Sequence, residues 1–184
     1  MSSDGDIRGP DGSIQPEPHA GDSAVQRRAE VLMLDLFEQQ LLVALQRPLI
    51  VPASATARME FDAGLLPENG PGILIEAWAH QGPPEGAQVK KVVVDAFKLA
   101  FAASILPVRP RLVLLFCDVE AAAPFASPKS WATAAFEANG IESVVVDLRP
   151  EDRALIREAQ AKQYRQAVRI AGGTAAGAAT ASIS

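Results

Sequence analysis

The sequence has a single cysteine, Cys117, and only 5% aromatic residues over 184 positions. One cysteine excludes an intramolecular disulfide and is more typical of a reducing compartment. No apolar run reaches the roughly 18 residues that a transmembrane helix needs. The N-terminus also lacks the basic and then apolar segments of a secretory signal. We therefore expect a cytoplasmic protein with no membrane partner.

Positive charge is also scarce, because 17 Lys and Arg residues stand against 22 Asp and Glu residues, a formal net charge of −5. Such a balance argues against a broad nucleic-acid-binding surface. Residues 81–184, however, carry 12 basic and 10 acidic side chains. A local cleft can focus positive potential whatever the net charge, so any phosphate-binding surface is expected in this second half.

Large apolar residues are rare at both ends of the chain. We expect residues 1–22 to form a disordered tail and residues 171–184 a low-complexity tail, which leaves 23–170 as one α/β domain. Apolar periodicity and turn signals predict the order α-β-β-β-α-β-α-β-α over 23–46, 48–52, 56–65, 73–79, 88–104, 111–118, 127–138, 142–148 and 150–169. The early strands are joined too tightly for crossovers, so we expect a mixed central sheet with helices on both faces.

Glu76 is the residue that fits its predicted element least well. It lies in the apolar stretch GILIEAWAHQG, where the segment 73–79 reads as a buried strand. A buried carboxylate is costly unless it is paired or bound to a metal. The position of Glu76 therefore suggests a partner from another part of the chain.

Two other segments offer carboxylates. Glu38 falls on the apolar stripe of the first helix, and Glu30, on the same side of the helical wheel, is a substitute. Because that helix is apolar nearly all round, the sequence leaves its buried face open. Asp62 shares one strand face with Glu60, opposite the apolar side chains of that strand. By strand alternation alone, a solvated strand face or a turn is the better explanation of Asp62, and Glu60 is an alternative partner for Glu76.

The helix 88–104 carries a polar stripe beside its apolar one. Gln88, Lys91, Asp95 and Lys98 recur at spacings of 3, 4 and 3 residues, which is typical of a solvated salt-bridge face and also of a phosphate-facing edge. Two carboxylates on neighbouring strands can hold a divalent cation through oxygen ligands. The cation then polarises a phosphodiester and activates water, while a lysine stabilises the developing charge.

Asp62 and Glu76 on consecutive strands, followed by a lysine-bearing helix, resemble the PD-(D/E)XK, or restriction-endonuclease-like, nuclease superfamily. The segment 76–101, EAWAHQGPPEGAQVKKVVVDAFKLAF, resembles a group of uncharacterised bacterial proteins of that type. The positions that carry this pattern are Glu76, Trp78, Ala79, Gly82, Lys91, Val92, Asp95, Lys98 and Leu99. The resemblance implies an α-β-β-β-α-β core, here with an extra C-terminal α-β-α extension, that hydrolyses DNA with Mg²⁺ or Mn²⁺.

The resemblance also assigns functions to residues. The expected catalytic residues are Asp62, Glu76, Lys98 and Lys91; the metal ligands are Asp62, Glu76 and Glu38; Gln88, Asp95 and His80 are supporting residues. One departure matters, because the superfamily pattern has Glu-x-Lys where this sequence has Glu76-Ala77-Trp78.

Three interpretations follow from that departure. In the first, the lysine function has moved to the helix and the protein is a nuclease. In the second, the domain is a catalytically inactive member of the same fold that binds nucleic acid or protein. In the third, the chain is an unrelated α/β protein that binds a small ligand at the strand end near Asp118.

Overall fold

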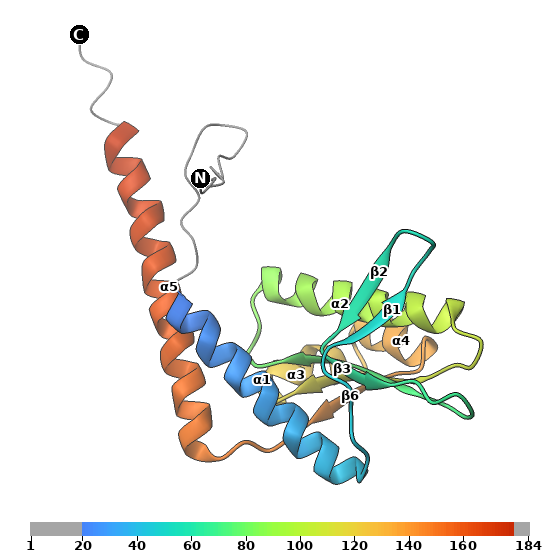
Figure 1. Cartoon of the computed structure of the whole chain (residues 1–184). Coiled ribbons are helices and arrows are strands. Elements are labelled where there is room, and N and C mark those ends of the chain that lie inside the picture. The colour runs from blue at the N-terminus through green and yellow to red at the C-terminus, as the bar shows by residue number, and fades with distance from the viewer. Residues whose placement is uncertain (1–19, 179–184) are drawn as a thin grey trace, which may run out of the picture.

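The computed structural model describes residues 20–178, and the side chains of residues 24–165 (Figure 1). Most of the expected tail at 1–22 and part of the expected tail at 171–184 lie outside the described residues. Their described parts are helical, because the first helix begins at Ala20 and the last helix continues to Ala178.

The helices and strands follow the predicted order closely. They are α1 (Ala20–Leu41), β1 (Leu49–Pro52), β2 (Arg58–Phe61), β3 (Ala63–Leu65), β4 (Ile73–Trp78), α2 (Gly86–Ile105), β5 (Arg111–Phe116), α3 (Val119–Ala126), α4 (Trp131–Ala138), β6 (Ile141–Val145) and α5 (Pro150–Ala178). The strand predicted at 56–65 is divided at Asp62 into β2 and β3, and α3 occupies a segment predicted as a loop.

The strands form a mixed sheet and a separate hairpin. The four-stranded sheet has the order β3-β4-β5-β6, in which β3 is antiparallel to β4 and the other pairs are parallel. The hairpin pairs β1 with β2. Because β3 pairs only with residues 73–75, the edge of β4 beyond Ile75 is left without a strand neighbour on that side.

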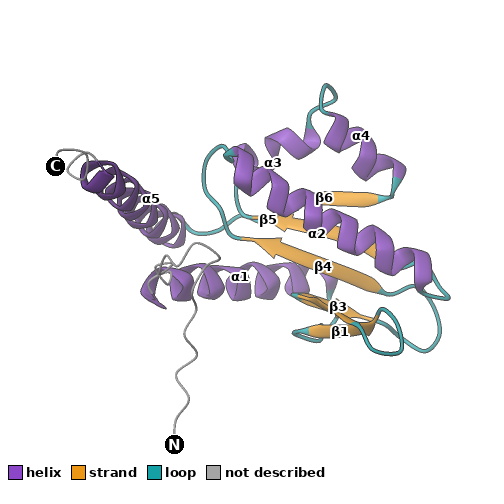
Figure 2. Cartoon of the chain, turned by 90° about the horizontal axis from the view of Figure 1, so that it is seen from above, coloured by secondary structure: helices purple, strands orange, loops and turns teal. Residues whose placement is uncertain are grey.

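Helices cover both faces of the four-stranded sheet, as predicted (Figure 2). One core lies under α2, α3, α4 and the hairpin, and it includes Leu74, Leu99 and Phe116. The other lies under α1 and α5, and it includes Met33, Ile75 and Val113. Strands β4 and β5 are buried on both faces, which explains their nearly continuous apolar sequences.

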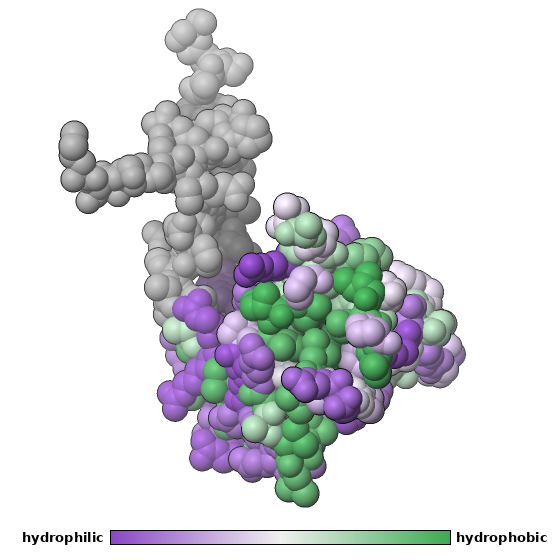
Figure 3. Space-filling view, turned by 45° about the vertical axis from the view of Figure 1, so that its right-hand side comes forward, coloured by the Kyte–Doolittle hydropathy of each residue, from purple (hydrophilic) through white to green (hydrophobic). Residues whose placement is uncertain are grey.

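Some large apolar side chains of the helices are exposed. The buried face of α1 runs through Ala29, Met33 and Phe37, whereas Val31 is 53% exposed. Trp131 begins α4 and is 72% exposed. Apolar side chains also gather in patches among polar ones on the surface, as Figure 3 shows for one side of the molecule. Among the described helices, none combines the length and apolar composition that crossing a bilayer requires.

Candidate functional site

Glu76 lies in the middle of β4 and points from the sheet toward α2, on the same face as Leu74 and Trp78. Lys98 of α2 meets it, with 2.5 Å between Lys98 Nζ and Glu76 Oε1. The contact is an ion pair rather than a hydrogen bond of good geometry, and Oε1 accepts no other hydrogen bond from the described residues. The lysine therefore comes from the helix and not from the strand.

Lys98 is held in place by two further contacts. Its ammonium donates a hydrogen bond to the carbonyl oxygen of Glu60, with an Nζ–O distance of 2.7 Å. The same nitrogen lies 5.1 Å from the centre of the Phe61 ring, a cation–π geometry. A lysine with three partners on fixed strands is oriented before any ligand arrives, which favours electrostatic catalysis.

Asp62 joins this centre because β2 and β3 are interrupted at its position. Its Oδ2 accepts a hydrogen bond from the backbone N–H of Ala77, at 2.7 Å, beside Glu76. This N–H belongs to the part of β4 that β3 leaves without a partner. The break in the strand thus turns Asp62 onto the edge of β4, and the alternative of a purely solvated strand face is wrong.

Burial and neighbouring charge raise the pKa of Glu76 to about 8. Loss of solvation in the core is the main cause, Lys98 opposes it, and the negative charge of Asp62 adds to it. With this pKa, part of the Glu76 population is neutral at pH 7, and a neutral carboxyl group costs less to bury than a charged one.

Glu30 of α1 is the second carboxyl with a displaced titration. Burial and the charge of Asp62 raise the pKa of Glu30 to about 7, against the opposing charges of Lys91 and Arg27. The charge of Asp95 also contributes, so the carboxyl of α1 lies within electrostatic reach of Asp62 and of residues on α2. Glu30, the substitute for Glu38 in the sequence-based expectation, is therefore the carboxylate that α1 contributes.

Lys91 and Asp95, the other charged residues of the polar stripe on α2, lie near Asp62 and Glu76. Lys91 Nζ pairs with Asp95 Oδ2 at 2.7 Å, one turn apart on α2. Burial acts to lower the pKa of Lys91, but Asp95, with help from Asp62 and Glu76, raises it overall. Lys91 is thus a cation at neutral pH. We call these six residues the carboxylate–lysine cluster: Glu30, Asp62, Glu76, Lys91, Asp95 and Lys98.

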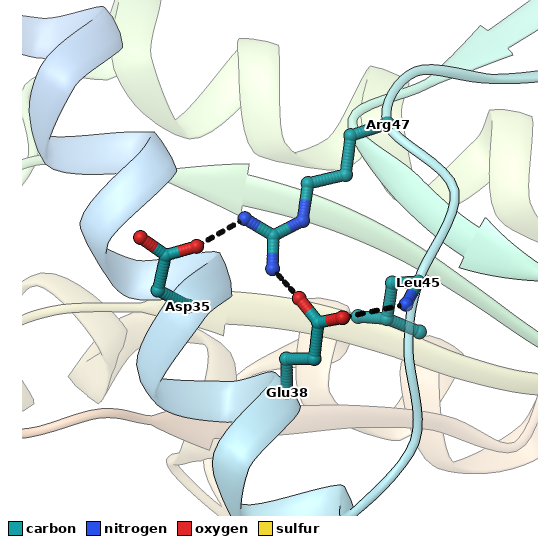
Figure 4. A network of polar contacts seen from close by, with 4 residues as sticks. All are labelled: Asp35, Glu38, Leu45 and Arg47. Atoms are coloured by element: carbon teal, nitrogen blue, oxygen red, sulfur yellow. Dashed lines mark hydrogen bonds and ion pairs between the residues drawn. The ribbon is translucent and has the colours of Figure 1, made fainter.

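Glu38 is not part of the carboxylate–lysine cluster. Its Oε1 accepts a hydrogen bond from the backbone N–H of Leu45 at 2.9 Å, and its Oε2 pairs with Arg47, which also contacts Asp35 (Figure 4). Glu38 follows Glu30 by eight residues, which is about 12 Å along a helix. Its carboxylate secures the segment that follows α1, and the expectation of a metal ligand at Glu38 is not supported by this position.

We expect Glu38→Ala to lower the free energy of unfolding by about 1–3 kcal/mol, because it removes a charge-assisted pair and a main-chain hydrogen bond. Urea denaturation followed by circular dichroism measures this loss. An unchanged free energy of unfolding would contradict this structural role of Glu38.

His80 and Asp118 lie at the carboxyl ends of β4 and β5 and have structural partners. The His80 ring stacks on Trp78, with 4.7 Å between centroids, and its Nδ1 lies 2.9 Å from the amide nitrogen of Gln160. Burial lowers the pKa of His80, so the ring is neutral at pH 7. Asp118 accepts hydrogen bonds from the backbone N–H groups of Gly82 and Glu120, and thereby caps α3. Its two oxygens are thus engaged by main chain.

Gln88 lies in the first turn of α2, where its Oε1 accepts a hydrogen bond from the Glu85 N–H at 2.7 Å. The backbone N–H of Gln88 in turn donates to the Glu85 side chain, and the two bonds form a capping box that fixes the start of the helix. In the polar stripe of α2, Gln88 thus caps the helix, whereas Lys91, Asp95 and Lys98 belong to the side of the helix near Glu76.

The donor chemistry of the carboxylate–lysine cluster fits a hard divalent cation. Asp62 and Glu76 offer oxygen atoms, and Glu76 Oε1 is buried with only Lys98 beside it. Among the described side chains, no three of the types His, Cys, Asp and Glu converge as a preformed metal site. Mg²⁺ is usually held by one or two carboxylates together with water and substrate phosphate. The two carboxylates match that mode of binding.

Comparison of the chain with protein-family models, with curated proteins and with solved structures found no match.

Proposed function

We propose that the protein is a metal-dependent nuclease that hydrolyses phosphodiester bonds in DNA. The observation that carries the proposal is the meeting of Lys98 with Glu76, 2.5 Å apart, while Asp62 is bound to the next backbone N–H of the same strand. Glu76 on β4 and Lys98 on α2 are thus in direct contact, and Asp62, from the break between β2 and β3, is bound to the backbone beside Glu76. Lys98 takes the function that the PD-(D/E)XK pattern gives to the strand position of Trp78.

The arrangement of elements supports a restriction-endonuclease-like core. Counting β2 and β3 as one interrupted strand, the chain runs α-β-β-β-α-β through β5, followed by the α-β-α extension. The acidic residues lie where β4 meets the break at Asp62, and the lysines lie on the next helix. Shared architecture alone does not carry function, so the proposal depends on the residues and their geometry.

In this proposal Asp62 and Glu76 hold Mg²⁺ or Mn²⁺, which supplies Lewis-acid polarisation of the phosphate and a more acidic water. The Lys98 ammonium stabilises the negative charge that grows on the phosphoryl oxygens. Lys91 adds positive charge from the same helix face. Glu30, with a pKa of about 7, can accept a proton from an attacking water near neutral pH.

The charge of Lys98 is open to a direct test. We expect Lys98→Met to lower Mg²⁺-dependent plasmid nicking by about 100-fold or more, because a preorganised cation facing the phosphate is removed. Lys90→Met is the matched control, since Lys90 is exposed on the same helix. Equal nicking by the two variants, with both folded, would remove Lys98 from the mechanism.

Trp78 supports a second candidate function, a non-catalytic DNA-binding or protein-interaction module. Its indole packs edge-on against Phe116 at 6.0 Å and stacks on His80, so it fills space where the superfamily pattern has an ammonium. Salt-dependent DNA binding without nicking in Mg²⁺ or Mn²⁺ favours this candidate. Absence of DNA binding even at low salt removes its nucleic-acid form.

A further inference from the structure

A cavity of about 490 Å³ lies at the carboxyl end of β4. Its walls come from α1, from the loop after β4, from the first turn of α2 and from α5. The side chains used below are Gln26, Glu85, Gln88, Gln160, Gln163 and Tyr164. The volume falls in the range of about 300–1,000 Å³ that is typical of small-molecule sites.

The lining of this cavity favours a neutral polar ligand. Five of its side chains are glutamines, four of them on α1, α2 and α5, and an amide group carries both a donor and an acceptor. Among the described residues that line it, none is a lysine or an arginine, and Glu85 brings negative charge. A phosphate or carboxylate group would meet no positive partner there.

One wall of the cavity is rigid. The side-chain oxygen of Gln160 accepts from the Gln81 N–H at 3.0 Å, and its amide nitrogen donates to the Gln81 carbonyl at 3.1 Å. Gln81 is itself tied to β5, because its amide nitrogen donates to the carbonyl oxygen of Cys117 at 3.0 Å. Helix α5 is therefore fixed to the end of β4, and its next turn supplies further lining residues.

Two features of the lining suit a planar heterocycle. Tyr164, on the described part of α5, presents an aromatic ring that is 64% exposed at the cavity rim. The oxygen of Gln88 is used in the capping box, so its amide nitrogen is the group that can meet a ligand. An aromatic face beside amide donors and acceptors is the usual way in which proteins recognise unstacked nucleobases.

The cavity adjoins the carboxylate–lysine cluster on two helices. Gln26 precedes Glu30 by four residues on α1, and Gln88 precedes Lys91 by three on α2. Each separation is about one helical turn, or about 5.4 Å. A ligand in the cavity therefore lies about one turn from Glu30 and Lys91, the members of the carboxylate–lysine cluster nearest to it along the two helices, and Lys98 lies about 15 Å beyond Gln88 along α2.

We propose that this cavity binds an unpaired nucleobase whose own phosphate lies at the carboxylate–lysine cluster. The inference rests on the proposed function, and it narrows the substrate class to single-stranded or frayed DNA. The same base chemistry is offered by a free nucleoside, so the two sources are separated by experiment.

The test is equilibrium binding of fluorescein-labelled single-stranded oligonucleotides to the full chain in EDTA, where hydrolysis cannot interfere. One oligonucleotide carries normal bases, and the other has the same backbone with abasic residues. We expect the intact strand to bind about 5- to 100-fold tighter than the abasic one, the range for stacking of one base. Tyr164→Ala and Gln163→Leu are expected to shrink this ratio, whereas Tyr164→Phe and the control Trp131→Ala retain it.

Equal binding of the two strands, no binding of either, or a ratio that survives Tyr164→Ala and Gln163→Leu would overturn the proposal. Adenosine or thymidine that displaces the intact strand at the concentration of the oligonucleotide itself assigns the cavity to free nucleosides; displacement only at far higher concentration assigns it to a strand. The binding assay contains no cation, so it does not depend on hydrolysis. If the protein prefers the intact strand but never nicks DNA, the result contradicts the hydrolytic function and leaves the cavity proposal standing. Nicking without a base preference contradicts the cavity alone.

Discussion

Replacing Glu76 with alanine is expected to lower Mg²⁺-dependent nicking of supercoiled plasmid by about 100- to 1,000-fold. The substitution removes one of the two carboxylates beside the cation position and leaves Lys98 without its buried partner. Loss of a single preorganised electrostatic group from an active site has effects of this size. Conversion of supercoiled to open-circular plasmid, measured over time in Mg²⁺ and in Mn²⁺, gives the two rates.

Glu137→Ala is the matched control, because Glu137 is an exposed carboxylate on α4. It should nick DNA like the wild type. Equal rates for wild type and Glu76→Ala, or no nicking by either, would contradict a hydrolytic function that depends on Glu76.

Glu76→Gln is expected to make the folded protein more stable than the wild type at high pH. Burial raises the pKa of Glu76 from an ordinary 4.5 to about 8. Below pH 4.5 both folded and unfolded chains carry the proton, and the full stability is present. Between pH 4.5 and 8 only the folded chain keeps it, so the free energy of unfolding falls as pH rises. Glu30 adds to this fall up to pH 7, its own pKa.

Glutamine imitates the protonated carboxyl group and cannot lose a proton. The gain from Glu76→Gln at pH 9 is expected to be on the order of 5 kcal/mol, from 1.36 kcal/mol for each unit of the change in pKa from 4.5 to about 8. Urea denaturation between pH 5 and pH 9 in EDTA measures it. Parallel stability curves for the two proteins would show that Glu76 is charged in the folded state throughout this range.

The sequence was sufficient to single out Glu76 and Lys98. A carboxylate in the apolar strand 73–79 requires a partner, either a positive charge or a metal. The polar stripe on the following helix supplied lysines as that positive charge. Helical periodicity places Lys98 on one face with Lys91 and Asp95, and that face turns out to lie beside β4. These features are local, so pattern alone defined them.

Asp62 and the carboxylate of α1 depended on tertiary structure. Strand alternation put Asp62 with the exposed Glu60, but the interruption between β2 and β3 redirects it to the backbone of Ala77. The helical wheel placed Glu38 and Glu30 on the same side of α1, and because α1 is apolar nearly all round, the wheel could not decide between them. In the folded chain, Arg47 in the segment after α1 forms an ion pair with Glu38.

Helix α3 and the glutamine-lined cavity left little trace in the sequence. Residues 119–126 combine alanines with an internal proline, Pro124, and Phe125 is the one large side chain among the residues that α3 buries. Gln160 meets Gln81 across 79 positions of chain, and such a contact has no local signal. The cavity exists only because α5 packs against the end of β4.

The most direct test of the central claim is calorimetric titration of Mn²⁺ into the full chain and into Asp62→Asn. Asparagine retains an oxygen that can accept the Ala77 N–H, so the fold at the edge of β4 is preserved while the charge is lost. We predict that the wild type binds Mn²⁺ and that Asp62→Asn lowers the affinity by about 10-fold or more. Loss of a residue that only supports a metal ligand already lowers metal affinity by about 10-fold or more, and loss of the ligand's own charge is expected to cost at least as much. No heat of binding with the wild type, or equal affinities for the two proteins, would contradict a cation site at Asp62 and Glu76.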